Sequence, residues 1–359
     1  MDWPLERDWD VLVVGGGPAG ALAGREAAAA GCSVLIIEAK SHAGEGCHCA
    51  EVVPLLLTRT VEIPAHLRRA QPTRIEMRLA GQRVVAESVH LVIERTIWEK
   101  ELLLAATQEG ATVTSGVRLE ELSPQGAVLA GSWGRGTVKA RAVVGADGAL
   151  SRTAAGLGLG RLETVPAIQL EVEANQEIAD SLIAFRPDLI GYLWLFPKGA
   201  TANLGGGGQV LGQASLKTMV EAWWQSLREE GLVGTSLFRR AGGLIPVAGP
   251  RPETAFVRDG QGVFLAGDAA GLTHPTLGAG IAQAAISGQL AGKAAAAFVQ
   301  GDPEAGADYQ RDLAAALGGY LNRGRERLVR ARDKWAADFE AAVRIYWSLW
   351  PRRKTGKSA

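Results

Sequence analysis

The residues with the clearest chemical use are three glycines near the start of the chain and one acid beyond them. Gly15, Gly17 and Gly20 follow an apolar run and open an alanine-rich segment. In such a turn the first glycine allows a tight bend, the second lets the backbone approach a pyrophosphate, and the third lets helix and strand pack closely. Glu38 follows roughly 20 residues later, where a carboxylate accepts ribose hydroxyls. The spacing predicts a dinucleotide site.

Three elements must hold these residues in place. Residues 11–14 form an apolar run that is typical of a buried parallel strand. Residues 21–30 have strong helix composition and end at Gly31, and the N-terminus of such a helix offers N–H groups and partial positive charge to phosphates. Residues 33–37 predict a second buried strand that ends at Glu38. Together they predict a βαβ unit.

Two later segments each place small residues and one carboxylate after an expected strand. They are Gly145-Ala146-Asp147-Gly148 and Gly267-Asp268-Ala269-Ala270-Gly271, the latter followed by Pro275, Gly278 and Gly280. Asp268 is expected where a strand ends beside the crevice of the first strand, the usual ligand position in an open α/β sheet. Its carboxylate is suited to accept from a ribityl hydroxyl, and the glycines after it expose a helix N-terminus to a phosphate or an electron-rich ring.

Composition narrows the class of protein. The chain has 359 residues, which favours two interleaved domains. Its 38 basic and 38 acidic residues give a formal net charge of +0, which argues against nucleic acid as a bulk partner. Three cysteines do not suggest a disulfide scaffold. We find no signal-peptide pattern and no apolar run of about 18 residues, so we expect a cytoplasmic location and no spanning helix.

The middle of the chain changes character. Residues 163–260 alternate apolar and polar side chains, which predicts a largely antiparallel sheet inserted into the first domain. Residues 73–94 predict strands with a turn at Ala80-Gly81, and residues 95–109 an amphipathic helix with Ile97 on its apolar face. The fold class is therefore α/β, with a Rossmann-like domain, an inserted antiparallel β-rich substrate domain and C-terminal helices. The predicted boundaries are 1–72, 95–162 and 261–300 for the Rossmann-like domain, 73–94 and 163–260 for the substrate domain, and 301–359 for the helical segment.

The order of the motifs GGGPAG, GADG and GDAAG resembles that of the flavin enzymes of the p-hydroxybenzoate hydroxylase fold. Within them, the closest resemblance is to the geranylgeranyl reductases. Three more stretches carry it, namely Cys49-Ala50-Glu51, Glu94-Arg95, and the run from Gly191 to Gly199 (GYLWLFPKG) with Asn203. The resemblance covers about residues 8–300, and the tail beyond is less like the family.

The resemblance implies a tightly but non-covalently bound FAD. The first turn would hold its pyrophosphate, Glu38 its adenosine ribose, and Asp268 the pyrophosphate and ribityl chain. The implied cofactor contacts are Gly15, Gly17, Pro18, Ala19, Gly20, Glu38, Ala39, Lys40, Cys49, Arg95, Val117, Ala146, Asp147, Gly267, Asp268, Gly278, Ala279, Gly280 and Ile281. The candidate catalytic residues are Cys49, Tyr192, Trp194 and His274. The resemblance implies that Tyr192, Trp194 and Phe196 line a substrate cavity under the inserted sheet.

The activity that the resemblance implies is reduction of C=C bonds in a polyprenyl or other lipophilic substrate. Two alternatives stay open. One is an FAD-dependent monooxygenase or halogenase that attacks an aromatic or peptide-bound substrate through a flavin hydroperoxide, and the other is an electron-transfer flavoprotein subunit. The electron donor, NADPH or another external reductant, is left open, as is the oligomeric state. No second dinucleotide fold is evident, so NAD(P)H would bind transiently.

The sequence departs from the family at two places near the expected flavin. The family's Cys-Gly-Glu-Gly is Cys49-Ala50-Glu51-Val52 here, and the loss of both glycines alters how the backbone can approach the flavin. His274 stands where the reductases usually have an acid or Asn. A histidine there is either a proton donor with a near-neutral pKa or a loop residue that packs against the cofactor.

Cys47-His48-Cys49 has several interpretations. Three adjacent residues rarely complete a tetrahedral shell and no Cys-x-x-Cys partner exists, so we expect no metal here. The two cysteines are either a strained disulfide pair, or Cys49 acts at the flavin, or all three are ordinary loop residues.

The C-terminal segment is aromatic and then basic. Tyr346, Trp347 and Trp350 precede a basic group made of Arg352, Arg353, Lys354 and Lys357. Aromatic and basic side chains suit a membrane interface, which a lipid substrate favours. The other interpretation is a C-terminal helix that packs on the protein and ends in a solvated basic tail.

Overall fold

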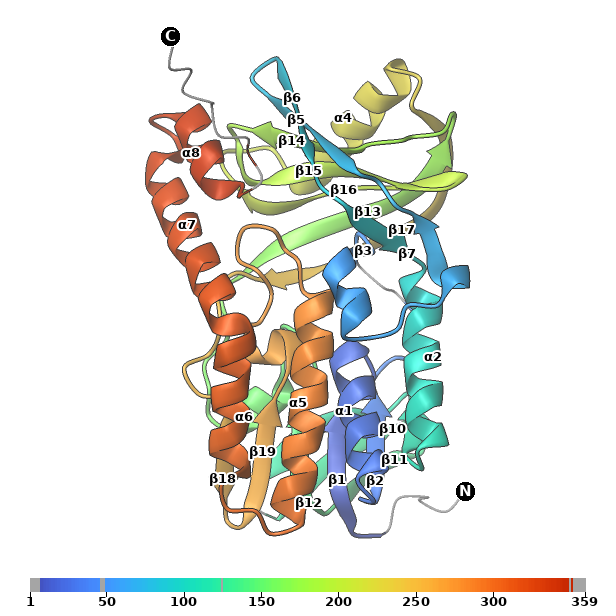
Figure 1. Ribbon diagram of the computed structural model, residues 1–359, viewed down its shortest axis with the longest axis vertical. Coiled ribbons are helices and arrows are strands. Elements are labelled where there is room, and N and C mark those ends of the chain that lie inside the picture. The colour runs from blue at the N-terminus through green and yellow to red at the C-terminus, as the bar shows by residue number, and fades with distance from the viewer. Residues whose placement is uncertain (1–6, 46–48, 124, 349, 351–359) are drawn as a thin grey trace.

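The computed structural model describes residues 7–45, 49–123, 125–348 and 350. Figure 1 shows two layers, one above the other. The lower layer is a sheet flanked by upright helices, the upper layer is a second, larger sheet, and a C-terminal helix runs along the side of both.

The lower layer is built on a six-stranded sheet with the strand order β18-β19-β12-β1-β2-β8. All its neighbours pair in parallel except β18 and β19. Its central strands are continuous apolar runs that are buried on both faces, as a parallel sheet requires. The predicted βαβ unit is therefore confirmed. The strands are β1 Trp9–Val14, β2 Val34–Glu38, β8 Thr112–Ser115, β12 Ala140–Gly145, β18 Ala255–Arg258 and β19 Gln261–Leu265.

Helices α1 (Pro18–Ala29) and α5 (Ile281–Val299) pack tightly against each other beside this sheet (Figure 1). Glycines allow the close approach, since a Cβ added at Gly288 would lie 2.2 Å from the backbone oxygen of Ala19. Helix α2 (Arg95–Gln108) follows as predicted, but Ile97 is 40% exposed, so its assignment to the apolar face is wrong.

A small three-stranded sheet covers the other face of the lower sheet. It consists of β9 (Arg118–Ser123), β10 (Gly126–Gly131) and β11 (Gly134–Val138). Its apolar side chains join a core with those of β1 and β2. Short helix α3 (Arg152–Gly156) packs beside β9.

The upper layer is a seven-stranded sheet with the order β17-β13-β16-β15-β14-β5-β6. All its pairs are antiparallel except β14 with β5. The predicted inserted antiparallel sheet is thus confirmed. Its strands are β5 Arg74–Leu79, β6 Gln82–Glu87, β13 Thr164–Ala174, β14 Ser181–Arg186, β15 Leu189–Lys198, β16 Thr201–Val210 and β17 Val233–Pro246.

The segment 73–94 does not stay together in one sheet. Strands β5 and β6 join the upper sheet through the predicted turn at Ala80-Gly81. Strand β7 (His90–Ile93) instead pairs with β3 (Val52–Pro54) and β4 (Arg68–Ala70). This third sheet lies between the two layers, so it links the loop after β2 to the upper sheet (Figure 1).

The two faces of the upper sheet have different partners. Helix α4 (Leu216–Glu229) packs on one face through Trp223 against residues such as Leu193 and Leu204. The side chains that point to the other face of the sheet, among them Trp194 and Phe196, form a separate core with the C-terminal helices. This second face is called the roof below.

The C-terminal segment is helical, as predicted. Helix α6 (Ala305–Leu313) continues through a π-helical turn (Ala314–Gly318) into α7 (Gly319–Trp335), and α8 (Phe339–Tyr346) follows. Tyr346 and Trp347 are buried against the roof, so these two side chains match the packed interpretation. The basic group from Arg352 to Lys357 lies outside the described residues. Within the part of the chain that the structure describes, no helix is long and apolar enough to cross a membrane.

The contact between α1 and α5 gives a first prediction. We expect Gly288→Ala to lower the free energy of unfolding by roughly 1–3 kcal/mol, because the new methyl group meets backbone rather than a flexible side chain. Gly306→Ala is the matched control, since a Cβ at this helical glycine lies 3.7 Å from its nearest neighbour. Urea denaturation of both variants measures the effect, and equal stabilities would contradict the packing argument.

Candidate active site

The glycine turn after β1 has the geometry that a bound pyrophosphate needs. Gly15 has φ +104°, and a Cβ added at Gly20 would lie 1.8 Å from the carbonyl oxygen of Gly15, so both positions require glycine. At Gly17 no atom lies within 4 Å of an added Cβ, which leaves space for a ligand. No side chain caps the N-terminus of α1, whose first residue is Pro18. The turn is therefore open to a phosphate.

Glu38 lies at the end of β2, directly beside this turn. Its Oε2 accepts the backbone N–H of Gly16 at 2.8 Å, and its Oε1 accepts that of Lys40 at 2.9 Å. Val117 N–H donates to the backbone oxygen of Glu38 at 2.9 Å. The structure thus brings together Glu38, Lys40 and Val117, as the expected adenosine end of the site requires.

A second group of predicted cofactor residues lies on the opposite side of the α1 N-terminus. A Cβ added at Gly267 would contact the Ala19 side chain at 3.3 Å, which brings the GDAAG segment to the first turn. Asp268 Oδ1 accepts the hydroxyl of Thr273 at 2.5 Å. Gly280 precedes α5, and again no side chain caps that helix. Two uncapped helix N-termini therefore lie near one another, an arrangement that fits a dinucleotide.

Asp147 behaves differently from the other predicted contacts. Its carboxylate accepts the hydroxyl of Ser151 and the backbone N–H groups of Arg152 and Thr153 at 2.5–2.9 Å. Burial raises the pKa of Asp147, and these hydrogen bonds oppose that effect. The carboxylate is thus engaged at the start of α3, while Ala146 beside it packs under Gly15.

A buried ion pair joins the lower layer to the roof. Glu51, after Cys49, is fully buried, and its Oε2 lies 2.8 Å from Nζ of Lys198 on β15. Asn203 on β16 donates to the same oxygen at 2.7 Å, and the N–H of Arg95 donates to Oε1 at 3.2 Å. Every carboxylate oxygen of Glu51 therefore has a partner.

More charges surround Lys198. Its Nζ lies 3.1 Å from Glu94 and 3.5 Å from Glu171, and Arg239 lies 3.6 Å from both Glu51 and Glu171. Burial by itself lowers the pKa of Lys198, but the carboxylates, Glu51 first, outweigh burial and raise it. The ammonium group is therefore charged at neutral pH. We call Glu51, Glu94, Glu171, Lys198 and Arg239 the interlayer cluster.

The interlayer cluster fixes the loop that carries Cys49. Glu51 has φ +63°, a strained value for a residue with a side chain, and its N–H donates to Sγ of Cys49 at 3.2 Å. Asn203 also donates to the backbone oxygen of Ala50 at 3.1 Å. Cys49 is half-buried at this point, whereas Cys47 and His48 lie outside the described residues.

The predicted aromatic residues lie in a row on the roof. Trp194 packs against Tyr192 on one side and Phe196 on the other, with ring centroids 5.8 and 6.5 Å apart. The Tyr192 hydroxyl donates to the backbone oxygen of Leu277, next to Gly278. Burial raises the pKa of Tyr192, with smaller contributions from Cys49 and Tyr320, so its phenol keeps its proton. The row lies between the Cys49 loop and the Gly278 turn.

His274 does not have the pKa expected of a proton donor. It is 3% exposed, its ring lies 4.4 Å from that of Tyr320 on α7, and its Nδ1 accepts the N–H of Leu277 at 3.2 Å. Burial, with a smaller contribution from Arg327, lowers the pKa of His274 to about 4. The expectation of a near-neutral pKa is therefore wrong, and His274 is a neutral ring packed in its loop.

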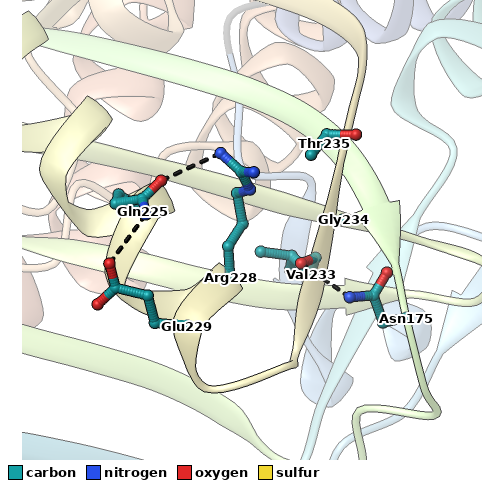
Figure 2. A pocket seen from close by; sticks show the side chains of 7 residues that line it. All are labelled: Asn175, Gln225, Arg228, Glu229, Val233, Gly234 and Thr235. Atoms are coloured by element: carbon teal, nitrogen blue, oxygen red, sulfur yellow. Dashed lines mark hydrogen bonds between the residues drawn. The ribbon is translucent and has the colours of Figure 1, made fainter.

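A separate concavity lies away from these residues, between α4 and β17 (Figure 2). It measures about 280 Å³, and four of the polar side chains that line it bond to one another or to backbone. Gln225 donates to Glu229 and accepts from Arg228, and Asn175 donates to the backbone oxygen of Val233. We assign no ligand to it.

Comparison with known proteins defines the class. A family model described as an FAD binding domain matches residues 8–225. This match, together with the two glycine-rich segments and their uncapped helices, makes the chain an FAD-dependent oxidoreductase.

The relatives define the family. Digeranylgeranylglycerophospholipid reductase 1 of Methanopyrus kandleri is 34% identical over 92% of this chain and 87% of its own length. The digeranylgeranylglycerophospholipid reductase of Methanocaldococcus jannaschii is 30% identical over 82% of this chain and 79% of its own. The chain belongs to the digeranylgeranylglycerophospholipid reductase family.

Solved structures support the fold. A geranylgeranyl bacteriochlorophyll reductase-like protein from Thermoplasma acidophilum has a TM-score of 0.81 and 22% identity, covering 96% of this chain and 97% of its own. The flavin-dependent halogenase CmlS has a TM-score of 0.68 and 17% identity, covering 92% of this chain and 64% of its own. The family relatives favour a reductase over a monooxygenase.

Sequence reasoning missed the interlayer cluster. Glu51, Glu94 and Lys198 stand in the motifs described above, but nothing in those motifs marks them as partners of one another, and Arg239 stands in none of them. One signal was available. Gln169 and Glu171 alternate with apolar neighbours on β13, and these apolar neighbours pack toward α4. Because successive side chains of a strand point to opposite faces of the sheet, Gln169 and Glu171 must face the lower layer.

The interlayer cluster gives a second prediction. Lys198→Met leaves Glu51 buried without its closest cation, and we expect the free energy of unfolding to fall by roughly 3–5 kcal/mol. Lys293→Met is the control, because that side chain is 66% exposed and 3.8 Å from Glu26, where a change of at most about 1 kcal/mol is expected. Denaturant unfolding compares them. A small loss for Lys198→Met would show that the pair does not join the layers.

The lowered pKa of His274 gives a third prediction, on acid stability. The folded pKa of about 4 lies below the ordinary value of 6.5, so the unfolded chain binds this proton first as the pH falls. The free energy of unfolding therefore begins to fall near pH 6.5 and continues to fall until about pH 4. The total decrease is about 3 kcal/mol, at 1.36 kcal/mol per pKa unit.

We therefore expect His274→Gln to lose less stability than the wild type between about pH 7 and about pH 4.5. His66→Gln is the control, because the His66 side chain is 62% exposed. Urea unfolding at both pH values measures the difference. An unchanged acid loss in His274→Gln would show that the ring is not held neutral.

Proposed function

We propose that this chain reduces carbon–carbon double bonds of a polyprenyl or similarly lipophilic substrate. The observation that carries the proposal is the row Tyr192, Trp194 and Phe196, which lies between the Cys49 loop and the Gly278 turn. An aromatic, largely apolar surface suits a hydrocarbon chain. The relatives' name makes a digeranylgeranylglycerol phospholipid a candidate substrate.

In this proposal the carboxyl ends of the parallel strands would hold FAD. The turn from Gly15 to Gly20 would hold its pyrophosphate, Glu38 the adenosine ribose, and Asp268 the ribityl chain. Gly278 to Ile281 would contact the flavin, and Arg95 and Val117 the adenosine side. When bound and reduced, FAD supplies the hydride.

The second hydrogen is a proton, and we assign its delivery to Cys49. The N–H of Glu51 fixes the position of its sulfur, and the thiolate left after transfer regains a proton from water. His274 lacks a suitable pKa, and Tyr192 holds its phenolic proton too tightly. The hydride and the proton together saturate one double bond.

Two features of the proposal concern partners. The hydride must be replaced by an electron donor, NADPH or another external reductant. A lipid substrate favours peripheral membrane contact, which would rest on the basic group from Arg352 to Lys357, because Tyr346 and Trp347 are buried.

The fourth prediction tests the function. The FAD-loaded protein is reduced with dithionite without oxygen, a geranylgeranyl lipid is added, and flavin absorbance is followed with mass spectrometry of the lipid. We expect the flavin to reoxidise as the lipid gains two hydrogens per double bond. A flavin that stays reduced until oxygen enters would favour the monooxygenase. Reoxidation that needs a second protein and leaves the lipid unchanged would favour an electron-transfer subunit.

Two variants separate cofactor binding from chemistry in this assay. Asp268→Ala should weaken FAD binding at least tenfold, because a carboxylate on the ribityl chain has no substitute nearby. Cys49→Ser should retain FAD and slow turnover. Normal rates in Cys49→Ser would remove Cys49 from the proposed proton transfer, and unchanged FAD affinity in Asp268→Ala would place the ribityl chain elsewhere.

A further inference from the structure

Gln169 on β13 is a buried amide that lacks hydrogen bonds. It is 2% exposed, and neither its Nε2 nor its Oε1 has a partner among the residues that the structure describes. Buried amides are nearly always paired, because water no longer satisfies them. The position therefore calls for a polar group that the chain itself does not provide.

Trp194 offers a second unpaired group beside it. In the sheet register Gln169 lies opposite Gly205, and Gly205 lies opposite Trp194. The indole leans over Gly205, since a Cβ added there would lie 2.7 Å from Cε2 of Trp194. Nε1 is bonded to that carbon, and it is also buried without a partner among the described residues. The glycine thus lets the indole lie over the strand that separates Trp194 from Gln169.

The neighbouring rows of the roof locate this pair. On one side lies the row Phe196, Asn203, Glu171 and Arg239, which contacts the loop of Cys49 through Glu51. On the other side lies the row that begins with Tyr192, which contacts the turn at Leu277. Gln169 and Trp194 therefore lie between the two rows of the roof that contact the loops proposed to flank the flavin.

The charges nearby argue for an uncharged ligand group. Lys198 and Arg239 are the cations of the adjacent row, and both form ion pairs with the carboxylates of Glu51 and Glu171. Nε and Nη2 of Arg239 have no hydrogen-bond partner among the described residues, but each lies 3.6 Å from one of these carboxylates. A phosphate at Gln169 would find these cations paired and the carboxylates close by, which is unfavourable. An amide and an indole N–H offer donors and one acceptor without net charge. A hydroxyl, which both accepts and donates, matches that set.

We propose that Gln169 and Trp194 bind an uncharged oxygen at the head of the substrate's chain, close to the double bond that is reduced. This oxygen is a hydroxyl in a polyprenyl alcohol and the chain-linking oxygen in a glycerophospholipid. The inference rests on the proposed function and adds the substrate's polar group to it. A hydroxyl held there would orient the chain, so that the double bond nearest the hydroxyl is presented for reduction. A phosphate ester of the same chain would be disfavoured at this position.

The fifth prediction tests this subsite with the FAD-loaded protein. Three probes of matched chain length are titrated, namely a polyprenyl alcohol, its monophosphate and the corresponding hydrocarbon, with flavin absorbance as the signal. We expect the alcohol to bind more tightly than the other two. In Gln169→Leu we expect alcohol affinity to fall about threefold to tenfold, as for the loss of a hydrogen bond, with no change for the hydrocarbon.

Control measurements separate the subsite from other roles of the amide. Gln209→Leu, at an exposed position of β16, should change none of the affinities. Product analysis after anaerobic reduction should show the double bond nearest the hydroxyl reduced first in the wild type, and this order should be lost in Gln169→Leu. FAD content of each variant is measured alongside.

Several outcomes would overturn the subsite. They are tighter binding of the monophosphate than of the alcohol, an equal effect of Gln169→Leu on alcohol and hydrocarbon, and loss of FAD in Gln169→Leu, which would assign the amide to the flavin. If the probes bind with the expected order but none is reduced, the proposed reaction fails while the subsite stands. If no probe binds or is reduced in the wild type, the proposed function fails and the subsite fails with it.

Discussion

The ion pair between Glu51 and Lys198 is the contact on which the rest of the site depends. It joins a loop of the lower layer to a central strand of the roof, and both side chains are almost fully buried. Two charges removed from water are tolerated only when each is closely paired, so neither residue can move without the other. The pair therefore fixes the distance between the layers, and with it the space in which a flavin and a substrate would meet.

The strain at Glu51 becomes understandable from this pair. The residue adopts φ +63°, which glycine would adopt without cost, yet its carboxylate is needed for Lys198, Asn203 and the N–H of Arg95. The surrounding hydrogen bonds offset the backbone strain. Cys49, two residues earlier, is held in place by the same loop, because the N–H of Glu51 donates to its sulfur.

The parts of the fold that could be predicted from the sequence are those specified by neighbouring residues. The βαβ unit follows from two apolar runs and a glycine turn, and the inserted sheet follows from alternation along each strand. The pairing of β7 with β3 and β4 could not be predicted, because short apolar strands carry no mark of their partner. Likewise the pKa of His274 depends on its burial and on Arg327, and α7 brings Arg327 and the Tyr320 ring that packs on His274 from far along the chain.

In the candidate site, too, residues that are close in the sequence could be predicted together, whereas residues that are far apart in the sequence could not. The cofactor positions Gly15, Gly17, Gly20 and Glu38 share one local segment, so their spacing was informative. The interlayer cluster joins Glu51 to Lys198 and Arg239, residues that meet only when two sheets face each other. Each of its members, taken alone, is an ordinary charged residue in a motif or a strand.

The most direct measurement is a crystal structure of the protein with FAD bound. The account predicts the pyrophosphate at the turn from Gly15 to Gly20 and the adenosine ribose at Glu38. It places the flavin ring between the Gly278 turn and the row of Tyr192 and Trp194, below the Cys49 loop. A ring that lies outside the space between the layers, or a pyrophosphate away from the glycine turn, would contradict it.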